Sequence, residues 1–400
     1  MKLLALVTDA FGGRGGIAKF NRDLLTTLSE HQACERIVAL PRIIVETPSH
    51  LPRKLDYRAK SAGGKIRYLR HVFRAITTER FDGVICGHLN LLPVAAAVSA
   101  LHRVPLLLVV HGVEVWRYAP SRLLRHASRR VDVLVSVSDF TRQRFLQWTS
   151  NRNLRSSVIP NCVDAQLFGS GPKPAELLSR YALRERTVLL TVARLSASER
   201  YKGVDEVLEL LPELGRRIPT LSYLLVGDGD DRARLEAKAS ALGVSERVVF
   251  AGYIPESEKA AHYRIADAFV MAGRGEGFGI VYLEALASGV PVVASTADAS
   301  REAVLNGTMG ELADPDKPHE LEAAILRALE RPVGIIPKAL ENFSVEKFRE
   351  RWSRLVDEVF CSESASDKSS NCEFTKDATV RPLADPPQRR VARTSLRSRN

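Results

Sequence analysis

The 400-residue sequence lacks the features that mark several protein classes. Its five cysteines form no Cys-x-x-Cys pair and no metal-ligand spacing, which argues against a disulfide framework and against a zinc site. No run of 18 apolar residues occurs, so no membrane-spanning helix is expected. Aromatic residues make up 6% of the chain and do not interleave with basic ones as on a base-stacking surface, so no nucleic-acid partner is expected.

The chain begins with an apolar run, residues 3–8, that is too short for a signal peptide. Asp9 and a glycine loop follow this run directly. We therefore expect a first β-strand there, and a cytoplasmic protein whose thiols are reduced.

Charge is unevenly distributed along the sequence. Residues 1–170 carry 25 Lys and Arg against 12 Asp and Glu, whereas residues 171–361 carry 25 against 30. A basic first half indicates an anionic partner, and a membrane surface, a phosphorylated acceptor and a nucleic acid all fit on charge alone.

Short Val-, Leu- and Ile-rich runs alternate with helical patterns along the chain. Such alternation predicts parallel sheets covered by helices on both faces. Two successive series, in a chain too long for one ordinary core, predict an α/β protein of two doubly wound, Rossmann-like domains. The expected parts are a first domain at 1–168, a linker at 169–174, a second domain at 175–342, a C-terminal helix at 343–361 and a disordered basic tail at 362–400.

A helix over residues 65–76 combines an apolar stripe with basic residues. The stripe and the basic positions are Ile66, Leu69, Val72, Phe73 and Ile76, and Lys65, Arg67, Arg70 and Arg74. Such a helix can lie on an anionic membrane. A core-packed helix with a solvated basic face is the commoner explanation of this pattern.

A glycine loop at residues 12–16 follows the first predicted strand and opens a helix. Backbone N–H groups of Gly15 and Gly16 could therefore approach a phosphate. The loop loosely fits a dinucleotide fingerprint, which needs an acid after the second strand. The chain has none at residues 39–42, which weakens the interpretation as a nicotinamide-dependent oxidoreductase.

Glu276 and Glu284 are the most informative pair in the sequence. Glu276 lies in a second glycine-rich loop, and Glu284 follows on the helix that this loop opens, with seven residues between the two acids. The loop offers backbone N–H groups that suit a phosphate. Carboxylates suit sugar hydroxyls, so a nucleotide sugar matches both.

Three further side chains are expected at the carboxyl ends of strands, where ligands of such sheets bind. His111 ends a strand of the first half, and Arg194 and Lys202 share a loop after the first strand of the second half. The two cations together can neutralise a diphosphate. Residues 228–231, which imitate a metal-binding Asp-x-Asp, are explained by a turn and a helix N-cap.

In their order and spacing these landmarks resemble the retaining nucleotide-sugar glycosyltransferases of family 4, which include bacterial phosphatidylinositol mannosyltransferases. The resemblance covers nearly residues 1–360 and implies the GT-B fold, two Rossmann-like domains facing across a cleft. The landmarks are Gly15 and Gly16, His111 and Glu114, residues 158–164, Arg194 and Lys202, residues 226–229, Tyr253, and Glu276 to Glu284.

The resemblance also implies roles for single residues. Glu276 and His111 would hold the donor sugar, Glu284 the ribose, and Arg194 and Lys202 the diphosphate. Backbone N–H groups of Gly16 and of Phe278, Gly279, Ile280 and Val281 would assist, and the base would lie near Gly227 and Tyr253. The family works without a catalytic metal or other cofactor, and its last helix crosses back onto the first domain.

The expected activity is therefore transfer of a hexose (mannose, glucose or galactose) from a GDP- or UDP-sugar. The acceptor would be a lipid-linked one or a polysaccharide or other glycoconjugate, and the enzyme could dock on the inner face of the membrane. The alternatives are the oxidoreductase and a non-catalytic module that binds a polyanion or a membrane.

Overall fold

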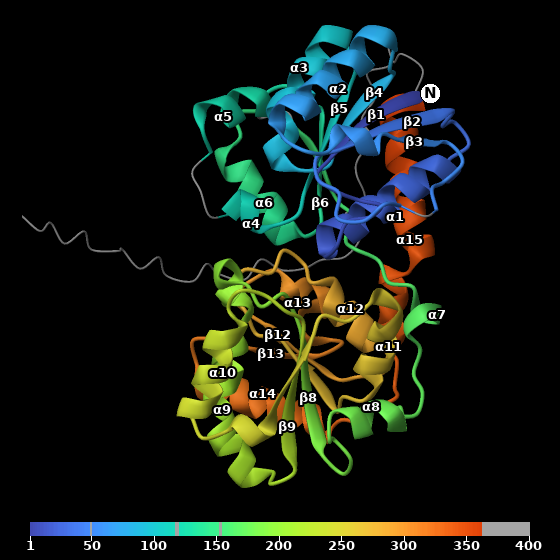
Figure 1. Cartoon of the computed structure of the whole chain (residues 1–400). Helices are drawn as coiled ribbons and strands as arrows, with labels where there is room; N and C mark the ends of the chain where they lie inside the picture. The colour runs from blue at the N-terminus through green and yellow to red at the C-terminus, as the bar shows by residue number, and fades with distance from the viewer. Residues whose placement is uncertain (49, 117–119, 152–153, 362–400) are drawn as a thin grey trace, which may run out of the picture. The chain divides into compact units, whose positions relative to one another are not determined.

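Two parallel sheets organise the chain (Figure 1). The computed structural model describes residues 1–48, 50–116, 120–151 and 154–361, so the tail predicted at 362–400 lies outside it. The first sheet has seven strands in the order β3-β2-β1-β4-β5-β6-β7. They are β1 Lys2–Val7, β2 Arg36–Pro41, β3 Leu55–Tyr57, β4 Gly83–Cys86, β5 Leu106–Val110, β6 Val133–Ser136 and β7 Arg155–Val158.

Helices connect these strands and cover the first sheet. They are α1 Gly16–Glu30, α2 Lys65–Thr78, α3 Leu92–His102, α4 Val113–Trp116, α5 Arg122–Ser128 and α6 Asp139–Trp148. The central strands β1, β4 and β5 are apolar apart from Lys2 at the start of β1 and are almost entirely buried, as expected for a parallel sheet with covered faces.

The second sheet repeats the arrangement with six parallel strands in the order β10-β9-β8-β11-β12-β13. The strands are β8 Thr187–Val192, β9 Leu221–Val226, β10 Val248–Gly252, β11 Ala268–Val270, β12 Val292–Ser295 and β13 Glu311–Ala313. The helices of this lobe are α7 Ala165–Phe168, α8 Ala175–Arg180, α9 Val204–Arg217, α10 Arg232–Ala241, α11 Glu256–Arg264, α12 Ile280–Ala287, α13 Ser300–Ala303 and α14 Pro318–Glu330. The predicted pair of doubly wound sheets is confirmed, although β3 and β13 were not expected from the sequence.

The last helix, α15 Val345–Val356, packs on the first lobe although it follows the second in the chain (Figure 1). The ring of Phe20 on α1 lies edge-on to Phe348 and Trp352 of α15, with centroids 5.5 and 6.3 Å apart. Just before α15, Val163 donates a backbone hydrogen bond of 2.9 Å to Phe343. Residues 1–361 accordingly form one compact unit.

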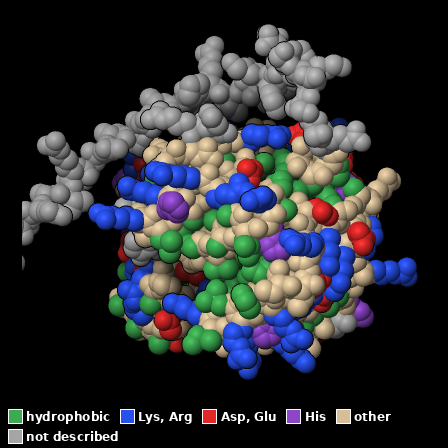
Figure 2. Space-filling model, turned by 90° about the horizontal axis from the view of Figure 1, so that it is seen from above, with side chains coloured by type: hydrophobic (Ala, Val, Ile, Leu, Met, Phe, Trp, Pro, Cys, Tyr) green, Lys and Arg blue, Asp and Glu red, His purple; other side chains and the backbone are tan. Residues whose placement is uncertain are grey.

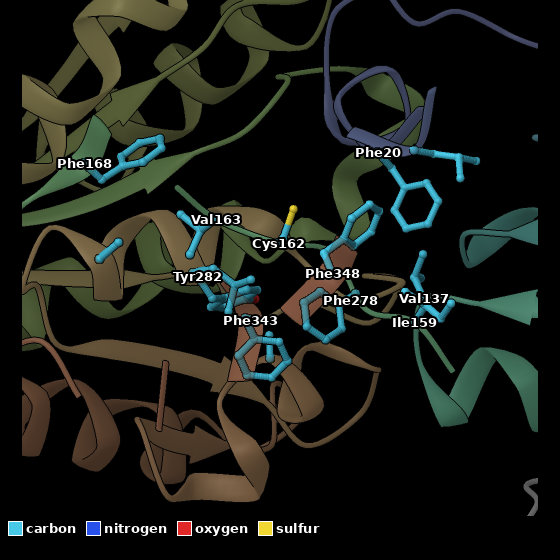
Figure 3. Close-up of a cluster of buried hydrophobic side chains, with 14 of the residues drawn as sticks. Phe20, Val137, Ile159, Cys162, Val163, Phe168, Phe278, Tyr282, Phe343 and Phe348 are labelled. Carbon is cyan, nitrogen blue, oxygen red and sulfur yellow. The ribbon is translucent and has the colours of Figure 1, made fainter. Parts of the chain in front are cut away.

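A buried apolar cluster lies where the chain passes between the sheets (Figure 3). Figure 3 shows Phe20 and Val137 from the first lobe close to side chains of the connecting segment, the second lobe and α15. The aromatic ring of Phe278 packs on Phe343 with centroids 5.5 Å apart. The loop that carries Glu276 is thereby fixed to the same core that joins the lobes.

Replacing Phe348 by alanine tests the importance of this core. The side chain is almost completely buried against Phe20 and Trp352, so we expect Phe348→Ala to lower the free energy of unfolding by about 3–5 kcal/mol. The matched control is Arg349→Ala, which removes only an exposed ion pair with Glu30 and should cost less than about 1 kcal/mol. Urea unfolding measures both; equal costs would contradict the assignment of α15 to the core.

Candidate functional site

One cavity of about 810 Å³ gathers most of the predicted site residues. It is lined by residues of both sheets' carboxyl-end loops and of the helices that follow them. The predicted residues that line it are Gly15, Gly16, Arg194, Lys202, Gly227, Tyr253, Ile280, Val281 and Glu284. Glu276, His111, Phe278 and Gly279 do not line it and belong to the adjoining loops.

Two helix N-termini contribute to the cavity wall. Gly15 precedes α1 and Gly279 precedes α12, both have positive φ, and neither helix has a side-chain cap. A Cβ at Gly16 would meet no atom within 4 Å, and one at Gly15 would meet only the guanidinium of Arg194, at 3.6 Å. The glycine loop of the first lobe therefore faces Arg194 with its backbone exposed, an arrangement suited to an anion.

The loop of Glu276 touches the loop of His111 directly. A Cβ on Gly277 would lie 1.7 Å from the carbonyl oxygen of His111, and one on Gly112 would lie 2.6 Å from the Cα of Gly277. Glycine at both positions is what permits this approach. The contact brings Glu276 and His111, 165 residues apart in sequence, to one place.

His111 is held in a defined protonation state. Its Nε2 lies 2.9 Å from the carbonyl oxygen of Gly87, which can only accept, so Nε2 carries the proton. Burial lowers the pKa of His111, against the opposing effect of Glu114. The ring packs edge-on against Phe20 with centroids 5.2 Å apart. The imidazole is thus neutral near pH 7, with Nδ1 as its acceptor.

Arg194 and Lys202 share a carboxylate that sequence reasoning missed. Glu199 Oε1 lies 3.1 Å from Arg194 Nη1, and its Oε2 lies 3.2 Å from Lys202 Nζ. Burial alone would lower the pKa of Lys202, but the carboxylates of Glu276 and Glu199 outweigh it and the pKa is raised. Both side chains are therefore cationic, and they sit close together on the cavity wall.

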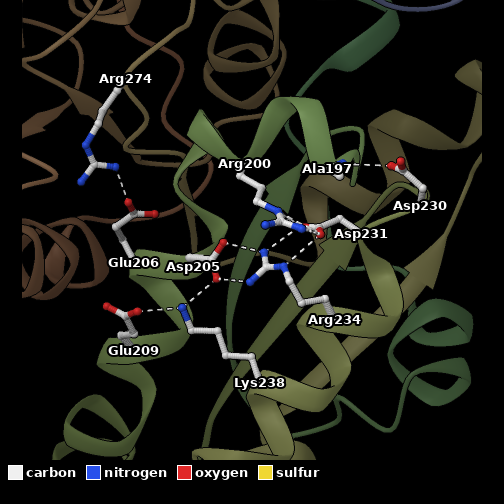
Figure 4. A network of polar contacts seen from close by, with 10 residues as sticks. All are labelled: Ala197, Arg200, Asp205, Glu206, Glu209, Asp230, Asp231, Arg234, Lys238 and Arg274. Atoms are coloured by element: carbon white, nitrogen blue, oxygen red, sulfur yellow. Dashed lines mark hydrogen bonds and ion pairs between the residues drawn. The ribbon is translucent and has the colours of Figure 1, made fainter. Parts of the chain in front are cut away.

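A polar network holds the loop that carries these cations (Figure 4). Arg200, in the same loop, binds the carboxylate of Asp231, and Arg234 binds both Asp231 and Asp205. Asp230 accepts a 2.9 Å hydrogen bond from the backbone N–H of Ala197. The aspartates of residues 228–231 thus serve the loop and the start of α10. Among the residues that the structure describes, no group of three His, Cys, Asp or Glu is placed to hold a metal ion.

Glu284 is completely buried at the cavity wall. Its Oε2 accepts a 2.8 Å hydrogen bond from the hydroxyl of Tyr263 on α11. Its Oε1 has no hydrogen-bond partner, and the nearest cation, Lys259 Nζ, lies 3.5 Å away. Burial raises the pKa of Glu284, while Lys259 and Tyr263 oppose the rise. Neither Lys259 nor Tyr263 was singled out from the sequence.

The remaining predicted residues are placed as follows. Tyr253 is exposed at the cavity, and the guanidinium of Arg14 lies 4.3 Å from its ring centroid. Phe278 is buried, so its side chain is not accessible to a ligand. A Cβ on Gly279 would lie 2.4 Å from the ring of Tyr282, which explains the glycine at the start of α12.

The carboxylate of Asp298 holds the backbone of Glu276 in place. Its Oδ2 accepts the backbone N–H of Glu276 at 2.8 Å, and its Oδ1 accepts the hydroxyl of Ser300 at 2.6 Å. Burial raises the pKa of Asp298 from 3.8 to about 7, although these hydrogen bonds oppose the rise. The carboxylate that supports the Glu276 loop therefore titrates near neutral pH.

This pKa predicts a pH dependence that an amide would remove. Because the folded-state pKa of Asp298 exceeds the ordinary value of 3.8, the folded state binds the proton more tightly, and raising the pH favours unfolding between about pH 4 and 7. We expect the stability of the wild type relative to Asp298→Asn to fall over this window by up to about 1.4 kcal/mol per pH unit. Urea unfolding at several pH values measures the difference; a constant difference would contradict the assignment.

Comparison with known proteins agrees with this geometry. Residues 14–167 match the family Glycosyltransferase Family 4, and residues 180–349 match Glycosyl transferases group 1. The GDP-mannose-dependent alpha-(1-6)-phosphatidylinositol monomannoside mannosyltransferase of Mycolicibacterium smegmatis is 37% identical over 267 residues, 62% of this chain and 68% of that protein. The phosphatidyl-myo-inositol mannosyltransferase of the same organism is 33% identical over 55% of each chain. The matched parts thus span roughly half to two thirds of these relatives.

Solved structures show the same fold. HepE of Anabaena, in complex with UDP and glucose, aligns with a TM-score of 0.71 at 22% identity over 90% of this chain and 100% of that one. Sucrose-phosphate synthase of Thermosynechococcus elongatus aligns with a TM-score of 0.68 at 20% identity over 91% and 100%. The predicted GT-B fold is confirmed, and the chain belongs to glycosyltransferase family 4 and is a glycosyltransferase.

Proposed function

We propose that this enzyme transfers a hexose from a nucleotide-diphosphate sugar with retention of anomeric configuration. The observation that supports this most strongly is the convergence on one cavity of two cations, two uncapped helix N-termini and a buried carboxylate. A diphosphate fits the first two groups and a ribose the third. The family assignment disfavours the nicotinamide-dependent oxidoreductase that the glycine loop left open.

Each residue has a role in this proposal. Arg194, Lys202 and the N-termini of α1 and α12 stabilise the charge that develops on the departing diphosphate, which is electrostatic catalysis. Glu276 binds hydroxyls of the donor sugar, beside the neutral imidazole of His111. Glu284 binds the ribose, and the base lies between Gly227 and Tyr253. The leaving phosphate takes the acceptor proton on the same face, and the reaction proceeds without a metal or other cofactor.

The donor and acceptor classes are proposed from the relatives. The mycobacterial relative is named for GDP-mannose and a phosphatidylinositol monomannoside, and HepE is solved with UDP and glucose. We propose a GDP- or UDP-activated mannose, glucose or galactose as donor. The acceptor is a lipid-linked glycan or another glycoconjugate, in polysaccharide or glycolipid synthesis.

Substitution of the charged residues tests the mechanism. Glu276→Ala should abolish sugar transfer while the protein stays folded, and Arg194→Ala and Lys202→Ala should each lower kcat by about 10²–10³-fold, as for a lost oxyanion donor. A panel of nucleotide sugars is first screened for the donor that raises the melting temperature most. The assay then follows release of GDP or UDP from that donor. Arg216→Ala, on the exposed face of α9, is the control. Unchanged turnover in Glu276→Ala, or stabilisation by NAD instead of a nucleoside diphosphate, would contradict the proposal.

Contact with an anionic membrane is proposed on the outer face of α2. The core face of this helix is Tyr68, Val72 and Ala75, so the expectation that its whole apolar stripe packs in the core is wrong. Ile66, Leu69 and Phe73 remain 78%, 48% and 67% exposed. They lie on one face of α2, because side chains three and four residues apart point to the same side of a helix.

Basic residues accompany this apolar face. Lys65, Arg67, Arg70 and Arg74 of α2 are all exposed. Figure 2, which looks down on the molecule from above Figure 1, shows hydrophobic side chains bordered by Lys and Arg. No helix among the described residues has the length and apolar character needed to span a bilayer. Apolar side chains beside cations fit the interface of an anionic lipid surface.

Vesicle binding tests this surface. The wild type should co-sediment with vesicles that contain phosphatidylglycerol but not with pure phosphatidylcholine, and binding should weaken as salt is raised. Phe73→Ser together with Arg70→Glu and Arg74→Glu should lose binding, by roughly 1 kcal/mol for each basic residue removed. The control is Arg216→Glu with Arg217→Glu, the same charge reversal on α9 of the second lobe. Equal binding by the α2 variant and this control would rule the surface out.

A further inference from the structure

Only one carboxylate oxygen of Glu284, a residue that lines the cavity, has a hydrogen-bond partner. Tyr263 donates its hydroxyl to Oε2 at 2.8 Å, and both side chains are fully buried. Oε1 is buried without a hydrogen-bond partner in a residue that lines the cavity. A carboxylate with both oxygens available could bind two neighbouring hydroxyls of a ribose, but here Oε2 is already engaged.

A lysine stands beside the available oxygen. Lys259 lies one turn before Tyr263 on α11, so the two side chains approach Glu284 from the same helix face. Its ammonium is 3.5 Å from Oε1, and Lys259 also lines the cavity. The ammonium forms an ion pair with Glu256 at 3.1 Å, which leaves donor capacity, because an ammonium has three N–H groups.

The other lysine near Glu284 is committed elsewhere. Lys19, on α1, donates to the carboxylate of Asp23 at 2.8 Å and lies 3.5 Å from the carbonyl oxygen of Cys162. Lys259, unlike Lys19, forms an ion pair with Glu284 itself and so is placed to share a ligand with it. The wall of the cavity thus offers an acceptor, Oε1, next to a donor, the Lys259 ammonium.

We infer that Lys259 and Glu284 together recognise the vicinal cis-diol of the donor's ribose. One hydroxyl donates to Glu284 Oε1, and the other accepts from the Lys259 ammonium. Each hydroxyl then has its own charged partner, and Lys259 makes the site selective for ribonucleotides over deoxyribonucleotides. This inference rests on the proposed function, in which Glu284 faces the ribose, and it adds Lys259 as a specificity-determining residue.

Binding of deoxy analogues to the full-length protein tests the pair without any substitution. The probes are GDP and UDP and, for the one that binds more tightly, its 2′-deoxy and 3′-deoxy forms, measured by calorimetry. Both deoxy forms should bind about tenfold or more weakly than the parent, because each loses a hydrogen bond to a charged group. Indifference of the wild type to one of the two hydroxyls would overturn the inference, since Glu284 alone would then suffice.

Lys259→Met shows which hydroxyl the lysine binds. The variant should bind the parent nucleotide about tenfold more weakly, and one of the two deoxy forms should then bind as tightly as the parent. Lys347→Met, which removes a lysine paired with a glutamate three residues away on the exposed face of α15, should leave all three affinities unchanged. If the Lys259→Met protein keeps the wild-type melting profile and still discriminates fully against both deoxy forms, the inference is overturned while the proposed function stands. Failure of the wild type to bind either GDP or UDP would overturn both.

Discussion

The candidate site depends on a contact between two loop backbones, at Gly277 and His111. No side chain fits between them, since even a methyl group on Gly277 would overlap the carbonyl oxygen of His111. The contact fixes the position of Glu276 relative to the first sheet, and Asp298 fixes the same loop from the second. A second contact supports it, because the carboxylate of Glu302 on α13 accepts the backbone N–H groups of Asp139 and Phe140 at the start of α6, both at 2.8 Å.

The cations proposed to bind the donor each lie beside a carboxylate. Lys202 shares the carboxylate of Glu199 with Arg194, and Lys259 lies beside Glu284. A buried charge without a partner is costly, and the largely buried ions Lys202 and Glu284 each have a counter-charge nearby. A bound diphosphate meets cations that are already oriented, which is the property that electrostatic catalysis requires. The negative charge of Glu199 opposes the affinity of the same cations for that anion.

Most of the fold followed from the sequence, because buried parallel strands have a strong signature. Long apolar runs such as residues 106–110 gave strands close to those observed. The strands β3 and β13 have three residues each and each includes an acidic residue, so neither forms an apolar run, whereas the equally short β11 is entirely apolar. The helix α2 was expected, but its pattern alone could not show that Val72 faces the core while Phe73 faces outward.

The site was predicted where residue type and loop position suffice. Arg194 and Lys202 lie in a loop that follows a strand, Glu284 lies on a helix that a glycine-rich loop opens, and all three line one cavity. Their partners Glu199, Lys259 and Asp298 could not be identified in the same way. Each acts through contacts that exist only in the folded protein, and one acidic or basic residue in a polar helix or loop has no distinguishing pattern in the sequence.

The position of α15 has a consequence for the order in which the protein can fold during synthesis. Phe20 of the first helix is packed by Phe348 and Trp352 of the last one. The ribosome makes the whole second lobe between these two segments. The core of the first lobe therefore stays incomplete until α15 has been made, and the second lobe, whose helices and strands are contiguous in sequence, can reach its native packing first.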